Sequence, residues 1–152
     1  MKVPACRMSI LPVLVGLLYA GSVQAQSQDG CPQLPPSSQL AWDHKANAGS
    51  DFCRALREDG SEAFGMYIAA KSPFVPKRGD RAEAGTIDGK PMYWYRGELA
   101  GKPDVQVRET LLELGDGRVA HIWLQAANPA QLGEIQNLTQ GLRFPSARLS
   151  SK

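Results

Sequence analysis

The sequence lacks the short motifs on which many enzymes and metal sites are built. It contains no Gly-x-Ser-x-Gly elbow, no Cys-x-x-Cys pair and no glycine-rich phosphate loop, and only two histidines stand among its 152 residues. A serine hydrolase, a thioredoxin-like redox protein or a phosphate-binding enzyme would normally show one of these patterns. The sequence therefore carries no catalytic signature, and we expect no cofactor and no resident metal.

An excess of one charge is also missing once an expected targeting segment is set aside. The chain has 17 Lys+Arg against 15 Asp+Glu, and two of the basic residues, Lys2 and Arg7, belong to that segment. The remainder is formally neutral. Because a neutral domain has no basic surface to attract phosphate groups, we expect neither nucleic acid nor an anionic membrane among its partners.

No apolar run is long enough to cross a bilayer as a helix. The run Ser9–Ala20 follows a start that carries Lys2 and Arg7, and it precedes the small-residue box Val23–Ala25. This three-part pattern is typical of a secretory signal peptide, so we expect residues 1–25 to be cleaved and the protein to be periplasmic or secreted. A retained membrane anchor is the alternative. A lipid anchor is disfavoured because no cysteine follows soon after the apolar run.

Two cysteines, Cys31 and Cys53, remain after this cleavage. In an oxidising compartment an even pair most simply forms one disulfide. By chain-entropy arguments, closing a loop of this length stabilises the fold by about 3 kcal/mol. The alternative is a redox or metal-binding pair, which neither the spacing nor an adjacent histidine supports. The disulfide would fasten the proline-rich segment 26–39, which we expect to be extended, to the rest of the domain.

Three Asp-Gly pairs flanked by strand-like residues dominate the remaining chain. Such a pair is typical of a tight turn between two antiparallel strands, and they lie at 59–60, 88–89 and 116–117. We therefore predict an antiparallel β-meander of about six strands in a single domain, residues 40–144, followed by a flexible tail at 145–152. The expected strand segments are 40–44, 51–58, 62–70, 84–87, 91–99 and the two arms of Val105–Ala126. Two prolines in 71–78 should interrupt the sheet.

One helix is predicted at the end of the domain. Asn128 is a good N-cap, and Pro129 suits the first helical position, where its missing N–H costs nothing. Gly141 is a natural stop. An apolar stripe at helical spacing is formed by Leu132, Ile135 and Leu138. The expected fold class is therefore α+β, with one C-terminal helix packed on the sheet.

The turn Gly85–Gly89 before an aromatic strand, and the ending Leu138–Phe144 (LTQGLRF), resemble those of Mog1/PsbP-like proteins. The order of elements over residues 40–144, paired hairpins and then a late helix covering the sheet, is similar as well. That group is also described as a sheet between helices, whereas one helix is expected here. Because its members have diverse roles, mostly as accessory or binding proteins, the resemblance implies no reaction and supplies no catalytic residues.

The two histidines are the first place to look for acid–base chemistry. A hydrolase would need a serine or cysteine and a carboxylate brought against His121 or His44. The simpler interpretation is that each histidine is a strand residue facing a loop or a partner. A two-histidine metal site completed by Asp43 is a further alternative, although metal ligands usually have closer spacing. Glu109 and Glu113 share one strand face, which a solvated sheet explains more simply than an acid pair.

An aromatic run is the best candidate for a binding surface. Residues 93–96 (YWYR) are consecutive, so they occupy both faces of their strand and some must point away from the main core. Tyr, Trp and Arg dominate binding hot spots. The alternative is that the second face is covered and all of these side chains are core. The residues we expect to bind are Tyr93, Tyr95, Arg96, His121 and Trp123.

These observations favour a non-enzymatic exported protein that binds a protein partner in the cell envelope, as an accessory module or as an inhibitor of a secreted enzyme. A small envelope hydrolase that uses His121 or His44 with a carboxylate is the first alternative. The second is an envelope factor that holds a small ligand or lipid between sheet and helix.

Overall fold

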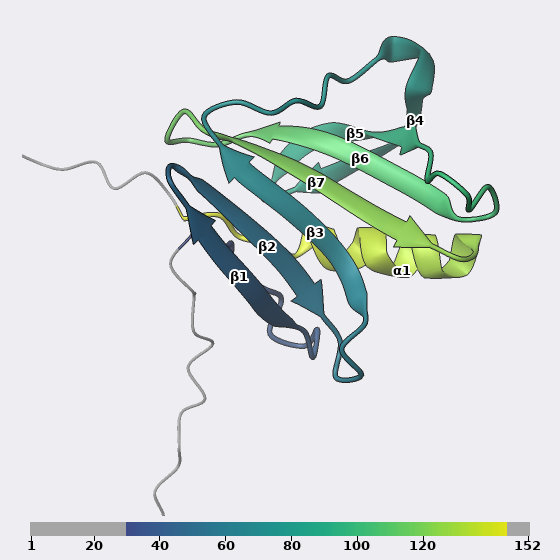
Figure 1. Ribbon diagram of the computed structural model, residues 1–152, viewed down its shortest axis with the longest axis horizontal. Helices are drawn as coiled ribbons and strands as arrows, with labels where there is room; N and C mark the ends of the chain where they lie inside the picture. Colours follow the sequence, from purple (N-terminus) through teal and green to yellow (C-terminus); the bar gives the residue numbers. More distant parts are fainter. Residues whose placement is uncertain (1–29, 146–152) are drawn as a thin grey trace, which may run out of the picture.

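The computed structural model describes residues 30–145 (Figure 1). The predicted signal peptide, the first residues of the proline-rich segment and nearly all of the predicted tail lie outside this range. Within it the chain forms seven strands, a short 3-10 turn and one helix. They are β1 (Ala41–Asn47), β2 (Ser50–Leu56), β3 (Glu62–Ala69), η1 (Arg78–Asp80), β4 (Arg81–Ile87), β5 (Lys90–Gly97), β6 (Gln106–Glu113), β7 (Val119–Ala126) and α1 (Pro129–Gln140).

All the strands form one antiparallel sheet in the order β1-β2-β3-β7-β6-β5-β4. The predicted α+β class, the antiparallel sheet and the C-terminal helix are confirmed. The count of about six strands is one short of the seven observed, and the prediction of one meander is wrong. The sheet has seven strands and consists of two meanders, β1–β3 and β4–β7, joined where β3 pairs with β7. The connection after β3 carries Pro73 and Pro76, which cannot donate to a ladder, and it interrupts the sheet there as predicted.

The Asp-Gly pairs lie in hairpin turns, as predicted, but only one forms a two-residue loop. Asp88 and Gly89 both have positive φ, 51° and 73°, as a type I′ turn requires. At Asp116-Gly117 the backbone N–H of Leu114 donates to the carbonyl of Arg118 at 2.9 Å, which closes a three-residue loop. Gly117, with φ of 85°, is its last residue.

Helix α1 lies along one face of the sheet and packs against β7 and β4 (Figure 1). The predicted cap is confirmed, because the side chain of Asn128 accepts a hydrogen bond from the backbone N–H of Gln131 at 2.9 Å. Leu132 and Ile135 of the helix are buried between it and the sheet. Gly141 follows the helix with φ of −80°, which any residue adopts, but an added Cβ would stand 2.6 Å from Pro35, so it is this contact that favours glycine. The strand side chains facing this core include Phe64, Met66, Ile68, Ala120, Ile122 and Leu124.

The N-terminal segment covers the rest of the same face. The predicted disulfide is confirmed: Cys31 and Cys53 are joined, with their Cα atoms 6.0 Å apart. The backbones of Gln33 and Arg143 form an isolated β-bridge, which ties the two ends of the described chain together. One face of the sheet is thus covered by the helix and this segment. We call the other side the open face.

Among residues 30–145 no helix is long and apolar enough to cross a membrane.

Candidate binding face

Strand alternation decides which predicted binding residues share the open face. Cross-strand pairs place Tyr95 beside Glu109 and Glu109 beside Trp123, so these side chains point the same way as Tyr93 and His121. Arg96 points to the other side, because it pairs with Arg108 on the helix side of β6. The structure therefore brings four of the five predicted residues onto one face and leaves Arg96 off it.

Tyr93 and Trp94 show how sharply the two faces differ. Trp94 is 3% exposed and belongs to the core, whereas its neighbour Tyr93 is 43% exposed. The alternative in which the whole aromatic run is core is therefore wrong for Tyr93. The guanidinium carbon of Arg81 lies 4.1 Å from the centre of the Tyr93 ring, an attraction between cation and π face that holds this exposed ring in place.

Five rings follow one another across the open face, and we call them the aromatic ladder. Successive centroid distances are 6.2 Å for Tyr95 to Phe74, 4.7 Å for Phe74 to His121, 5.6 Å for His121 to Trp123 and 5.6 Å for Trp123 to Phe52. The rings come from β5, the connection before η1, β7 and β2. Edge and stacked contacts of this kind each add roughly 0.5–1.5 kcal/mol beyond area burial, so they stabilise this arrangement of the rings.

Two members of the ladder were not predicted as site residues. Phe74 lies in the irregular connection between β3 and η1, and its ring is stacked on His121 with an interplanar angle of 5°. Phe52 lies on β2 beside Tyr67 of β3. The next residue after Phe74, Val75, is 70% exposed, so the connection leaves an apolar side chain in solvent beside the ladder.

Trp123 is held flat on the sheet by a glycine and a carboxylate. An added Cβ on Gly65 would lie 2.4 Å from the indole carbon Cζ2, so the ring can occupy this position only because residue 65 has no side chain. The indole N–H donates to Glu62 at 3.1 Å. Nearby, the guanidinium of Arg54 hydrogen-bonds Asp43 and holds the pKa of that carboxyl below its usual range. Charged groups therefore border the ladder at this end.

His121 is paired with a carboxylate in the centre of the open face. Its Nε2 lies 3.2 Å from Oε1 of Glu109, and the two side chains are 15% and 27% exposed. In the part of the chain that the structure describes, the hydrogen bonds of this pair include no serine, threonine or cysteine side chain. The pair can orient the imidazole and exchange a proton with a bound group, but no nucleophile is placed against it.

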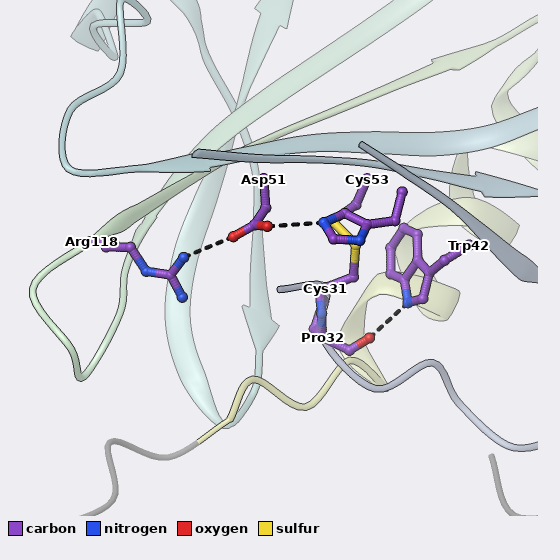
Figure 2. The surroundings of a disulfide bond; sticks show 7 residues. Cys31, Pro32, Trp42, Asp51, Cys53 and Arg118 are labelled. Carbon is purple, nitrogen blue, oxygen red and sulfur yellow. Dashed lines mark hydrogen bonds and ion pairs between the residues drawn. A yellow bond between two sulfur atoms is a disulfide. The ribbon is translucent and has the colours of Figure 1, made fainter. Parts of the chain in front are cut away.

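The second histidine lies on the covered face, beside the disulfide. His44 Nε2 is 2.9 Å from Asp51, and Asp51 in turn is 2.9 Å from Arg118. Figure 2 shows Asp51 between Arg118 and the Cys31–Cys53 bridge, with the Trp42 indole donating to the carbonyl of Pro32. His44 and His121 therefore point to opposite sides of the sheet, and the two-histidine metal site considered from the sequence cannot form.

One other group of metal-ligating side chains is present in the described region. Ligand atoms of Cys31, Cys53 and His44 lie within 4.8 Å of one another. The two sulfurs are, however, bonded to each other, so neither is a thiolate that could coordinate an ion. With the disulfide formed, the cluster is a structural cross-link of the fold.

No protein-family model, curated protein or solved structure gives a significant match to this chain. The resemblance to Mog1/PsbP-like proteins stays a prediction.

Proposed function

We propose that the protein is an exported, non-enzymatic binding protein whose open face docks a protein partner in the cell envelope. The observation that carries this proposal is the aromatic ladder, which occupies the sheet face that neither the helix nor the N-terminal segment covers. The disulfide is compatible with an oxidising compartment outside the cytoplasm.

The composition of the face supports protein binding in particular. Aromatic side chains with few rotatable bonds surround the His121–Glu109 pair at its centre, and further charged groups lie at its border, among them Glu62, Arg54 and Asp43. Interfaces commonly have this arrangement, with aromatic hot spots inside a polar rim. Because the rings already touch one another, little conformational entropy is lost when a partner covers them.

The test compares a variant of the ladder with a variant of a residue on the other face of the same sheet. A partner captured from envelope extract is identified and purified, and its affinity is measured by calorimetry. Tyr95→Ala combined with Trp123→Ala should weaken binding at least ~100-fold, since each ring is a candidate hot spot. Arg96→Ala, an exposed change that points away from the ladder, should leave the affinity unchanged.

Two results would refute the proposed face. One is equal loss of affinity in the Arg96 variant and the ladder variant. The other is a ladder variant that binds normally. Melting temperatures of all three proteins are compared in parallel, because unfolding of the ladder variant would show that its rings serve the core instead.

A hydrolase is the second candidate, and the His121–Glu109 pair is the observation that favours it. It predicts that Glu109→Gln, which keeps the shape of the side chain, removes a measurable turnover of envelope substrates while leaving partner binding intact. Binding without turnover in the unaltered protein would exclude it.

A further inference from the structure

We propose that β1 is a self-association edge, through which two copies of the chain pair antiparallel about His44 and continue the sheet from one copy into the other. This inference does not need the proposed partner on the open face, because it rests on the backbone edge of β1 and on its own charges, of which Asp43 also borders that face.

The first argument is the direction of the backbone groups on β1. The β1–β2 hairpin closes at the pair Asn47–Ser50 around a two-residue turn. In such a hairpin the closing pair exchanges hydrogen bonds, and alternate residues then turn their N–H and C=O outward. On β1 these are Trp42, His44 and Ala46. Among the described residues, none of the three makes a backbone hydrogen bond outside the ladder with β2.

The second argument is that the opposite edge of the sheet is protected and β1 is not. β4 has a register irregularity between Arg81 and Ala84, and α1 packs against it. Bulges and covering helices are the usual ways in which a sheet blocks its edges. The β1 register, by contrast, runs without interruption from Ala41 to Asn47. A continuous, uncovered edge is a template for another strand.

The third argument is charge, which selects both the partner and the register. Asp43 and Lys45 flank His44 and point to the open face, where Oδ2 of Asp43 accepts from Arg54 of β2 and Oδ1 is left for a partner. When two β1 strands pair antiparallel about His44, Asp43 of each copy stands opposite Lys45 of the other. Shifting the register by two residues instead places Asp43 opposite Asp43, or Lys45 opposite Lys45. Opposite charges across a strand pair are favourable and like charges are not, so β1 is complementary to itself in one register.

The same register is also compatible with the side chains on the covered face. The half-buried Trp42 of each copy comes opposite Ala46 of the other, a large residue beside a small one. Only seven residues of β1 are involved, so the contact is small compared with the interfaces of permanent dimers. The association is therefore weak, with a dissociation constant on the order of 10 µM or more, and it is strengthened where the protein is concentrated.

The test uses two charge variants, each of which should self-associate weakly but should associate with the other. Lys45→Asp leaves β1 with two acidic groups, and Asp43→Lys leaves it with two basic groups. Sedimentation equilibrium from roughly 5 to 500 µM should show each variant associating at least ~10-fold more weakly than the unaltered protein. An equimolar mixture should regain association, because every cross-strand pair is then of opposite charge.

A proline pair tests the backbone part of the proposal. Ala46→Pro removes one outward N–H from β1 and should abolish association. Thr86→Pro is the matched control, because Thr86 is exposed on the opposite edge and its N–H also points outward, next to the closing pair Ile87–Lys90. It should leave association unchanged. Circular dichroism spectra and melting temperatures establish that each variant is folded.

The proposal is overturned if the unaltered protein is monomeric at the highest concentration. It is also overturned if Ala46→Pro associates normally, or if mixing the two folded charge variants restores nothing. An effect of Thr86→Pro equal to that of Ala46→Pro would move the association away from β1 and overturn it as well.

Discussion

At the scale of single residues, Gly65 sets the position of the Trp123 ring in the aromatic ladder. Its missing side chain is the space in which the Trp123 indole lies. Gly65→Ala should lower the free energy of unfolding by about 1–3 kcal/mol, because an added methyl group must push the indole off the sheet. The same change should weaken partner binding, since the displaced ring also loses its hydrogen bond to Glu62. Chemical denaturation and calorimetry measure the two effects.

Gly115→Ala is the control for this prediction. An added Cβ at Gly115 meets no atom within 4 Å, and its backbone does not require positive φ. It should change stability by only a few tenths of a kcal/mol. Equal effects at positions 65 and 115 would mean that the indole moves freely and that the ladder is not rigid.

Single residues also show where the sequence was sufficient and where it was not. Neighbouring residues of a strand point to opposite faces, so Tyr93 and Tyr95 share one face while Trp94 and Arg96 share the other. Strand alternation alone could therefore have excluded Arg96 from the open face. Phe74 had no such signal, because it lies in an irregular proline-containing segment that has no periodicity. Its place on His121 depends on where the whole connection runs.

At the scale of elements, Glu83 links β4, β6 and α1. Its carboxylate accepts two hydrogen bonds from Arg108, both at 2.8 Å, and a third from Gln136 of α1 at 3.3 Å. The Arg108 hydrogen bonds are the largest cause of the lowered pKa of Glu83, which falls from 4.5 to about 2. A lowered folded-state pKa stabilises the protein above the unfolded value, and this contribution is lost as the pH falls from 4.5 towards 2.

We therefore expect Glu83→Gln to lower the melting temperature at pH 7 and to have much less effect near pH 2. The loss at pH 7 should be no more than about 1 kcal/mol, because the Glu83 side chain is 43% exposed and solvent screens the pair. Glu58→Gln serves as the control, since Glu58 is exposed in the turn after β2 and has no salt bridge among the described residues. A Glu83 effect that is the same at both pH values would contradict the assignment.

The elements themselves were largely predictable, but their order in the sheet was not. Alternation and the Asp-Gly turns identify strands that are neighbours in the chain, and the Asn128 cap identifies the helix. These are local signals. The pairing of β3 with β7 joins segments about fifty residues apart, and no turn specifies it. The two strands are adjacent because both are buried in one core, and no local sequence pattern predicts that pairing.

At the scale of the whole molecule, the disulfide holds the N-terminal segment over the core. Cys31 and Cys53 are both buried, 1% and 0% exposed. Replacing both by alanine should lower the free energy of unfolding by about 3 kcal/mol, because the unfolded chain regains the freedom of the loop between them. Urea denaturation of the two proteins measures the difference.

Thiol labelling checks the bond directly. The protein without residues 1–25, unfolded without reductant, should give no labelled cysteine, and the same sample after reduction should give two. Two labelled thiols before reduction would show that the bridge does not form in the cell.

The pairing of β3 with β7 also has a consequence for how the fold assembles as the chain is synthesised. The strand that completes the middle of the sheet is the last to be synthesised, so β3 has an exposed side until residues 119–126 arrive. The first three strands and both cysteines are synthesised before β7, so until then β1–β3 form only part of the sheet. Strand edges left open in this way are prone to wrong pairing. The final hairpin and helix therefore act together as a closing step, which fixes both halves of the molecule at once.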